Sequence, residues 1–385
     1  MSIINSIQAI QIIDSRGTPT VSCKVTLDNG IYATSMVPSG ASTGSREALE
    51  LRDGASTYKG KGVTKAVANI HEIIAPALVG MDVTNQQEID ETMLALDGTS
   101  SKSKLGANAI LGVSLAVLDA GSKTLELPLY EHINQVFANI NGEKPRMQMP
   151  TPMLNIINGG EHADNNIDIQ EFMIMPIGAN NFSQAMQWAT EIYSDLKNIL
   201  NAKGLSTSVG DEGGFAPNLQ SNQEAIELII QAIRNNNLTE GKDVGIALDC
   251  AASEFYNNGI YNLQGESIKL NSSEFTNYLS ELTHQYPIFS IEDGMDESDF
   301  EGWKNLNKAL GGSCQLVGDD LFVTNVAELQ RGIDDSLANS ILIKFNQIGT
   351  ITETMKTIHL GNQHGFKSII SHRSGETEDS TIADL

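Results

Sequence analysis

The feature that most constrains the fold is an alternation of short apolar runs with longer helical patterns after residue 150. Seven apolar runs read as strands, at residues 153–157, 172–175, 245–248, 288–291, 315–317, 341–343 and 368–370. Helical patterns lie between most of them, such as 182–200, 223–233, 324–337 and 350–360. Strand–helix alternation over this length predicts an α/β fold with a parallel sheet, closed as a (β/α)8 barrel. Because such a barrel needs eight strands, the last strand is expected to be missing, with the C-terminal segment that carries it.

The segment before the barrel mixes strands and helices without regular alternation. Strands are expected at 7–13, 21–27 and 31–36, with a hairpin turn at Asp28-Asn29-Gly30, and helices at 63–79, 85–96 and 107–125. This mixture predicts an α+β N-terminal domain over residues 1–138. The polar, loop-like stretch 139–150 marks the expected boundary, and residues 139–385 form the predicted barrel domain.

The charge balance bears on the classes of partner. Lys and Arg number 24 against 48 Asp and Glu, a formal net charge of −24, which disfavours direct binding of nucleic acid. An acidic chain also repels anions, so a phosphorylated substrate would need local cations or metal ions. The three scattered cysteines show no disulfide or zinc spacing. No signal peptide and no apolar run of membrane-spanning length is found, so a cytoplasmic protein is expected.

Charged residues stand where the predicted barrel strands end. Asp249, Glu292, Asp319 and Lys344 each follow one of these strands, and His372-Arg373 follow the last. The C-terminal ends of barrel strands converge on one face, where active sites of this fold are built. Three carboxylates facing one another repel unless a cation lies between them, and magnesium suits ligation by carboxylates alone.

Each of these residues has an ordinary structural interpretation as well. An Asp after a strand is more often a helix N-cap, as Asp320 would be before Leu321. A single Lys at a strand end usually reaches solvent, and the glycine-rich residues 210–214 could form a plain turn. Regular spacing of four charged strand ends favours the functional interpretation over these.

Nine sequence runs resemble those of the enolase family, in its order and over nearly the whole chain. They are VPSGASTG (37–44), INGGEHADN (157–165), QEFMIMP (170–176), SVGDEGGFAPN (208–218), ALDCAASEFY (247–256), SIEDGMDE (290–297), VGDDLFVTN (317–325), LIKFNQIGT (342–350) and SHRSGETED (371–379). The resemblance, to the bacterial type, implies a magnesium-dependent lyase of glycolysis and gluconeogenesis. Such an enzyme dehydrates 2-phosphoglycerate reversibly to phosphoenolpyruvate.

The resemblance also implies roles for individual residues. Asp249, Glu292 and Asp319 would bind a first Mg²⁺, and Ser42 would complete a second metal site when its loop closes. Lys344 would be the general base and Glu212 the general acid. The remaining expected site residues bind substrate: His162, Gln170 and Glu171 near the carboxylate and leaving group, and Arg373 and Ser374 at the phosphate, with His372 beside them.

The chemistry explains the need for these residue types. Removing the proton alpha to a carboxylate adds a second negative charge, which two Mg²⁺ ions would stabilise. A lysine is a base near neutral pH only if its pKa is lowered, as neighbouring metal ions would do. Glu212 must be protonated when hydroxide leaves, and repulsion from Glu171 would raise its pKa.

Two other functions stay open. One is another enzyme of the enolase superfamily, a racemase or cycloisomerase, although its usual Lys-x-Lys motif is replaced here by Gln170-Glu171-Phe172. The other is a non-catalytic surface or assembly protein on the same scaffold, since family members also occur at the cell surface or secreted. The family resemblance further implies a homo-oligomer, either a dimer or an octamer.

Overall fold

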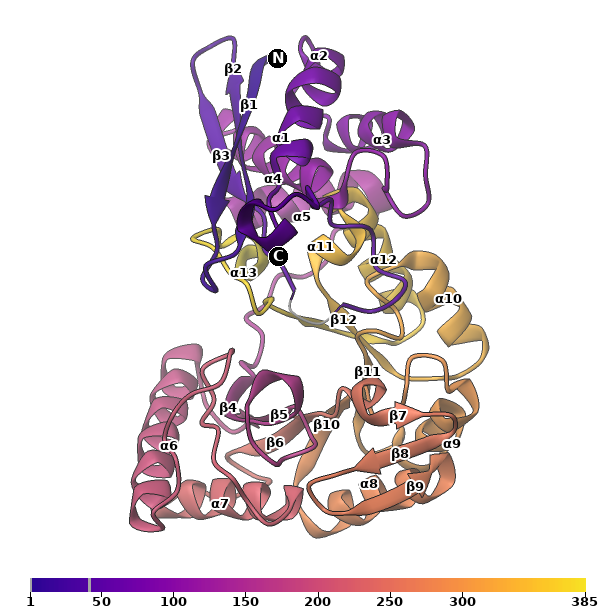
Figure 1. The fold of residues 1–385 in the computed structure, drawn as a ribbon. Helices are drawn as coiled ribbons and strands as arrows, with labels where there is room; N and C mark the ends of the chain where they lie inside the picture. The colour runs from indigo at the N-terminus through magenta and orange to yellow at the C-terminus, as the bar shows by residue number, and fades with distance from the viewer. Residues whose placement is uncertain (1, 41–42) are drawn as a thin grey trace. The chain divides into compact units, whose positions relative to one another are not determined.

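The computed structural model describes residues 2–40 and 43–385, and contacts divide the chain into two compact units (Figure 1). The first unit comprises Met1–Met147, Phe322–Arg331 and Leu342–Leu385, and the second comprises Gln148–Leu321 and Gly332–Ile341. The predicted domain boundary at residues 138/139 stays a prediction.

The first unit is built on an antiparallel sheet of three strands, β1 (Ile4–Ile13), β2 (Pro19–Leu27) and β3 (Tyr32–Met36), as the sequence predicted. Helix α4 (Ala107–Thr124) packs on this sheet. It does so closely, because a Cβ added at Gly112 would lie 3.4 Å from side-chain carbons of Cys23 and Val37. The buried, alanine-rich character of α4 makes that approach possible.

Further helices surround α4. They are α3 (Gln86–Asp97), α5 (Leu129–Asn141), α11 (Phe345–Ile348) and α12 (Ile351–Gln363). Helix α13 (Thr381–Asp384) packs on α5, and α10 (Val326–Asp334) begins in the first unit and ends in the second. The predicted helix at 63–79 is present as one continuous run of α1 (Thr64–Asn69), a π-helical turn η2 (Ile70–Ile74) and α2 (Ala75–Leu78), with a proline in the first turn of α2. The C-terminal segment thus belongs to the same core as the N-terminal residues: Phe345, Ile351 and Met355 are buried with them.

A seven-stranded sheet has the order β13-β12-β11-β10-β6-β5-β4. Its strands lie where the sequence predicted them: β4 (Leu154–Asn158), β5 (Glu171–Met175), β6 (Gly245–Asp249), β10 (Ile288–Glu292), β11 (Gln315–Gly318), β12 (Ser340–Ile343) and β13 (Lys367–Ile370). The division between the units falls within β12.

The prediction that this sheet is parallel is wrong for β5. The pairs β6–β10, β10–β11 and β11–β12 are parallel, but β5 is antiparallel to both β4 and β6. A parallel neighbour requires a crossover, usually a helix. Residues 159–170 between β4 and β5 contain only the short 3-10 helix η3 (Gly160–His162), so the chain turns back. Two helices, α6 (Phe182–Ala202) and α7 (Asn222–Asn235), then return it antiparallel to β6.

The second unit also contains a small antiparallel sheet that the sequence did not reveal, formed by β7 (Tyr256–Asn257), β8 (Ile260–Leu263) and β9 (Ile268–Asn271). It precedes α8 (Ser272–Gln285), and α9 (Phe300–Leu310) follows β10. Among the residues that the structure describes, no helix has both the length and the apolar character to cross a membrane.

Candidate active site

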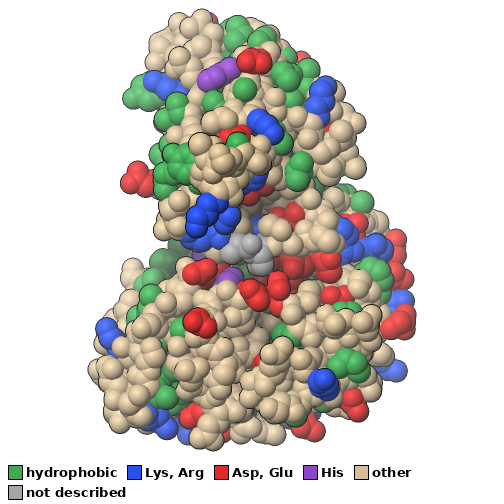
Figure 2. All heavy atoms as spheres, in the orientation of Figure 1, with side chains coloured by type: hydrophobic (Ala, Val, Ile, Leu, Met, Phe, Trp, Pro, Cys, Tyr) green, Lys and Arg blue, Asp and Glu red, His purple; other side chains and the backbone are tan. Residues whose placement is uncertain are grey.

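Three carboxylates of the second unit stand side by side across neighbouring strands. Asp249, the last residue of β6, is paired in register with Glu171 of β5 and with Glu292, the last residue of β10. Neighbouring strands lie about 4.8 Å apart, so this register sets the three carboxylates in a row. Asp249 and Glu292 are buried, only 5% and 8% exposed. Figure 2 shows acidic side chains gathered along one edge of this unit.

The next strand adds a cluster of three aspartates. Ligand oxygens of Asp293, Asp319 and Asp320 all lie within 4.8 Å of one another, just beyond the ends of β10 and β11. Asp293, at a φ of 40°, accepts the backbone N–H groups of Asp319 and Asp320, each at 2.9 Å. Burial, with the charges of Asp320, Asp319 and Asp249, holds the pKa of Asp293 well above its usual range. The interpretation of Asp320 as a helix N-cap is wrong, because the next helix, α10, begins only at Val326.

A second cluster joins His162, Glu171 and Glu212. Nδ1 of His162 lies 3.4 Å from Oε1 of Glu171 and 3.6 Å from Oε2 of Glu212. Glu212 lies in a turn closed by a bond from the Gly210 N–H to the Gly214 carbonyl, 2.8 Å, in which Gly213 has a φ of 86°. The predicted turn at 210–214 therefore exists and also delivers a carboxyl group to the cluster.

The carboxyl groups of Glu171 and Glu212 interact directly. Burial, followed by a hydrogen bond and repulsion from Glu212 and the charges of Asp249 and Glu292, raises the pKa of Glu171 well above its ordinary value. A hydrogen bond between two carboxyl groups requires that one of them carry a proton. The raised pKa of Glu171 therefore favours retention of a proton by this pair.

Gln170 orients the central carboxylate of the row. Its Nε2 donates to Oδ2 of Asp249 at 3.0 Å, and its backbone N–H donates to the Asp249 carbonyl at 3.0 Å. Oδ1 of Asp249 accepts the N–H of Ala251 at 2.8 Å. Neutral amide donors fix this side chain without removing its charge.

The donor set fits a hard divalent cation. Buried carboxylates from β6, β10 and the end of β11 supply only oxygen ligands, as Mg²⁺ prefers. Burial, followed by the repulsion between these groups, raises the pKa values of Glu171 and Asp293, and a bound cation would relieve that repulsion.

The first unit holds the other predicted residues. Lys344 follows β12, and its backbone N–H donates to the Thr324 hydroxyl at 2.9 Å. Lys344 and Arg373 line the same small cavity, together with Glu376 and Asp379. Ser42 lies outside the described residues.

Arg373 and Ser374 are held by residues that the sequence did not single out. Nη1 of Arg373 lies 3.2 and 3.3 Å from the two carboxylate oxygens of Glu47, and both side chains are buried. Arg16 donates to the Ser374 hydroxyl at 3.5 Å, whereas His372 is exposed. The barrel residues were predicted because they follow barrel strands. Arg16 and Glu47 come from the N-terminal segment, so that reasoning could not find them.

Family models match both parts of the chain. Residues 4–133 match the model described as "Enolase, N-terminal domain", and residues 146–385 match "Enolase, C-terminal TIM barrel domain". The fold is accordingly α/β, with an enolase-type barrel preceded by an N-terminal domain. On these two matches and the carboxylate sites described above, the chain belongs to the enolase family.

Proposed function

We propose that the chain is a phosphopyruvate hydratase, which interconverts 2-phosphoglycerate and phosphoenolpyruvate with Mg²⁺ as cofactor. The observation that carries the proposal is the row Glu171, Asp249 and Glu292, together with the cluster in which Glu212 and His162 lie beside Glu171. Carboxylates that could bind a metal, beside a carboxyl group whose pKa is raised, suit the loss of hydroxide from a substrate that carries a carboxylate.

The second unit would supply the metal ligands and the general acid. Asp249, Glu292 and Asp319 would hold the first Mg²⁺, and Asp293 and Asp320 lie beside Asp319. When bound, the metal stabilises the negative charge that develops on the substrate carboxylate. Glu212 would give its proton to the departing hydroxide, and His162 would fix the orientation of the Glu171–Glu212 pair.

The first unit would supply the base and the phosphate ligands. Lys344 would remove the alpha proton through Nζ, and Arg373 with Ser374 would bind the phosphate. Buried Glu47 holds the guanidinium of Arg373 in one orientation. Ser42 as a ligand of a second Mg²⁺, the dimer or octamer, and the cytoplasmic location stay predictions from the resemblance.

Measuring phosphoenolpyruvate formation and exchange of the alpha hydrogen separately distinguishes the base from the acid. Lys344→Ala is expected to abolish both phosphoenolpyruvate formation and exchange of the alpha hydrogen with deuterated solvent. Glu212→Gln should block dehydration but keep measurable exchange, because the carbanion still forms. Lys356→Ala, a half-exposed lysine paired with Glu91, is the matched control and should keep both activities. Exchange surviving in Lys344→Ala would show that another group is the base.

Metal binding is tested separately. Asp319→Ala should weaken Mg²⁺ binding in a calorimetric titration by at least tenfold, whereas Asp335→Ala, an exposed partner of Lys304, should not. Unchanged affinity in Asp319→Ala would remove this residue from the metal site.

A further inference from the structure

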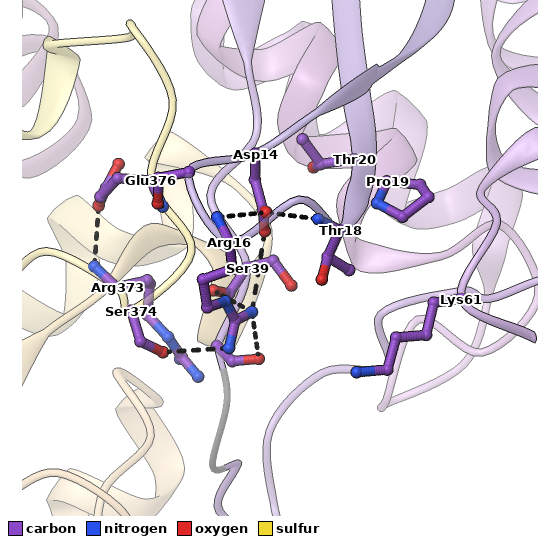
Figure 3. Close-up of polar contacts among 12 residues, drawn as sticks. Asp14, Arg16, Thr18, Pro19, Thr20, Ser39, Lys61, Arg373, Ser374 and Glu376 are labelled. Atoms are coloured by element: carbon purple, nitrogen blue, oxygen red, sulfur yellow. Dashed lines mark hydrogen bonds and ion pairs between the residues drawn. The ribbon is translucent and has the colours of Figure 1, made fainter. Parts of the chain in front are cut away.

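A network of polar contacts in the first unit surrounds Arg16, which the proposed reaction does not use (Figure 3). Arg16 lies in the turn after β1, and Oδ1 of Asp14 accepts the backbone N–H groups of Arg16 at 2.9 Å and Thr18 at 2.8 Å. Oδ2 of Asp14, whose side chain is fully buried, lies 3.8 Å from Nη2 of Arg16. The Asp14 carboxylate therefore stabilises the turn and also pairs with the guanidinium of Arg16.

The guanidinium of Arg16 joins two segments that are far apart in the sequence. Nη2 donates to the carbonyl oxygens of Ser39 at 3.2 Å and Gly40 at 3.1 Å. Nη1 donates to Oγ of Ser374 at 3.5 Å, a long bond. The planar, rigid fork of arginine permits such simultaneous contacts, which the single ammonium of lysine cannot reproduce in the same geometry.

Backbone bonds tie the same segments together. Ser39 and Gly375 exchange two N–H···O bonds, each 2.8 Å long. The N–H of Ser15 donates to the Glu376 carbonyl at 2.8 Å, and the N–H of Glu376 donates to the Ser15 hydroxyl at 3.0 Å. Residues 373–376 are thus fastened to the turn that carries Arg16.

The packing leaves little room for adjustment. A Cβ added at Gly375 would lie 2.4 Å from Oδ2 of Asp14 and 2.8 Å from Nη2 of Arg16. A Cβ added at Gly40 would lie 1.7 Å from Nη2 of Arg373. A displacement of the Arg16 guanidinium would therefore be transmitted to its neighbours at Gly40 and Gly375.

We propose that Arg16 is a positioning residue for phosphate binding, acting through Ser374, with Asp14 holding it in place. The Ser374 oxygen accepts from Arg16, so the hydroxyl hydrogen can be donated to a phosphate oxygen. A neighbouring guanidinium also strengthens that donation, because it polarises the hydroxyl. The proposal rests on the proposed function in one respect, namely that Arg373 and Ser374 bind phosphate.

Calorimetric titration with inorganic phosphate at a fixed Mg²⁺ concentration tests this role without turnover. Arg16→Ala should weaken phosphate binding about tenfold, equivalent to about 1.4 kcal/mol. Arg16→Lys should recover part of that loss, because the charge stays while the fork is lost. In the double variant Arg16→Ala/Ser374→Ala, affinity should equal that of Ser374→Ala, since a residue that acts through Ser374 adds nothing once the hydroxyl is gone.

Arg52→Ala is the matched control. Arg52 is similarly exposed and bonds instead to the Ser39 hydroxyl and to Glu50, so this variant should bind phosphate within about twofold of wild type. In turnover assays, Arg16→Ala should raise KM for 2-phosphoglycerate about tenfold and change kcat less than about twofold, the signature of an interaction lost equally from the ground state and the transition state.

Four results would overturn the proposal: wild-type phosphate affinity in Arg16→Ala, additive losses in the double variant, an equal loss in Arg52→Ala, or no phosphate binding by the wild-type protein. A wild-type protein that binds phosphate but forms no phosphoenolpyruvate would contradict the proposed function instead, and the phosphate titrations would still decide the role of Arg16.

Discussion

At the scale of single residues, Asp90 shows what it costs to bury a carboxyl group in the first unit outside the candidate site. Asp90 of α3 is fully buried; its oxygens accept from Nε2 of Gln86 at 3.1 Å and from the backbone N–H and hydroxyl of Thr352 at 3.0 and 2.6 Å. Burial nevertheless raises its pKa from 3.8 to about 6. The free-energy cost of desolvating the carboxylate thus exceeds the stabilisation that its hydrogen-bond donors supply.

This shift predicts a pH dependence of stability. In the unfolded chain Asp90 ionises near pH 3.8, but in the folded protein only near pH 6, so between these values the folded state holds the extra proton. The contribution of Asp90 to the free energy of unfolding is therefore fully present below about pH 4 and is lost as the pH rises through about 6. The loss is about 3 kcal/mol, since each pKa unit corresponds to about 1.36 kcal/mol.

Asp90→Asn should remove that dependence. An amide keeps the shape, and Gln86, whose Oε1 is buried without a hydrogen-bond partner, can turn to accept from it. Urea unfolding at pH 4 and pH 7 should show the variant gaining about 3 kcal/mol relative to wild type at the higher pH. Glu91→Gln, at the exposed neighbouring position, should show a much smaller effect of opposite sign. A constant difference between Asp90→Asn and wild type would contradict the shift.

Residue types also explain how much of the candidate site could be predicted. Asp249, Glu292 and Lys344 could be found because a charged residue directly after an apolar run is unusual and a barrel brings such positions to one face. Asp293 follows Glu292 immediately, and only the backbone bend at its positive φ turns it toward Asp319 and Asp320. Aspartate adopts positive φ more readily than most residues, but its type alone does not tell that the chain bends here.

At the scale of elements, apolar runs located all seven strands of the larger sheet, but not the direction of β5. Strand position follows from local hydrophobicity, whereas direction depends on whether each connection crosses over. The absence of a helical pattern at residues 159–170 was the available signal for a reversal, because a parallel neighbour needs a crossover. The β7–β9 sheet was missed because its strands are not continuous apolar runs: β8 is IYNL and β9 is IKLN.

Helix caps in the second unit predict unequal effects of similar substitutions. Asn271 caps α8 in a capping box with Glu274, at an exposed position. Asp299 caps α9 through the N–H of Gly302 at 2.9 Å and also accepts the hydroxyl groups of Tyr261 at 2.8 Å and Ser272 at 2.5 Å. Tyr261 is fully buried, so its hydroxyl would lose an acceptor where water does not replace it.

Asn271→Ala should cost about 1 kcal/mol of unfolding free energy, the usual value of an N-cap. Asp299→Ala should cost about 3 kcal/mol, because loss of the cap adds to a buried donor without its acceptor. Urea titrations of both variants check the order. Equal losses would show that the Tyr261 and Ser272 bonds to Asp299 contribute nothing.

At the scale of the whole molecule, the first unit is assembled from separate stretches of the chain. Phe345, Ile351 and Met355 are buried in the same cluster as the apolar residues of α4, and in Figure 1 the yellow C-terminal helices lie among the purple N-terminal ones. Polar contacts follow the same pattern. Buried Lys102 pairs with Glu353 at 3.0 Å, and the Ser114 hydroxyl accepts the N–H of Ile351 at 3.1 Å.

Residues 1–147 are therefore expected not to form a stable domain alone, although a family model for an N-terminal domain covers 4–133. Without 342–385, the apolar face of α4 that meets Phe345 and Ile351 would be exposed, and Lys102, Asp90 and Ser114 would lose partners in a buried setting. Expression of 1–147 should yield a fragment with poor NMR dispersion and a broad urea transition. Co-expression with 342–385 should restore both, whereas co-expression with 342–385 carrying Phe345→Asp and Ile351→Asp should not. A fragment 1–147 that unfolded as sharply, and at the same urea concentration, as the full chain would show that the N-terminal segment needs no core residue from beyond residue 341.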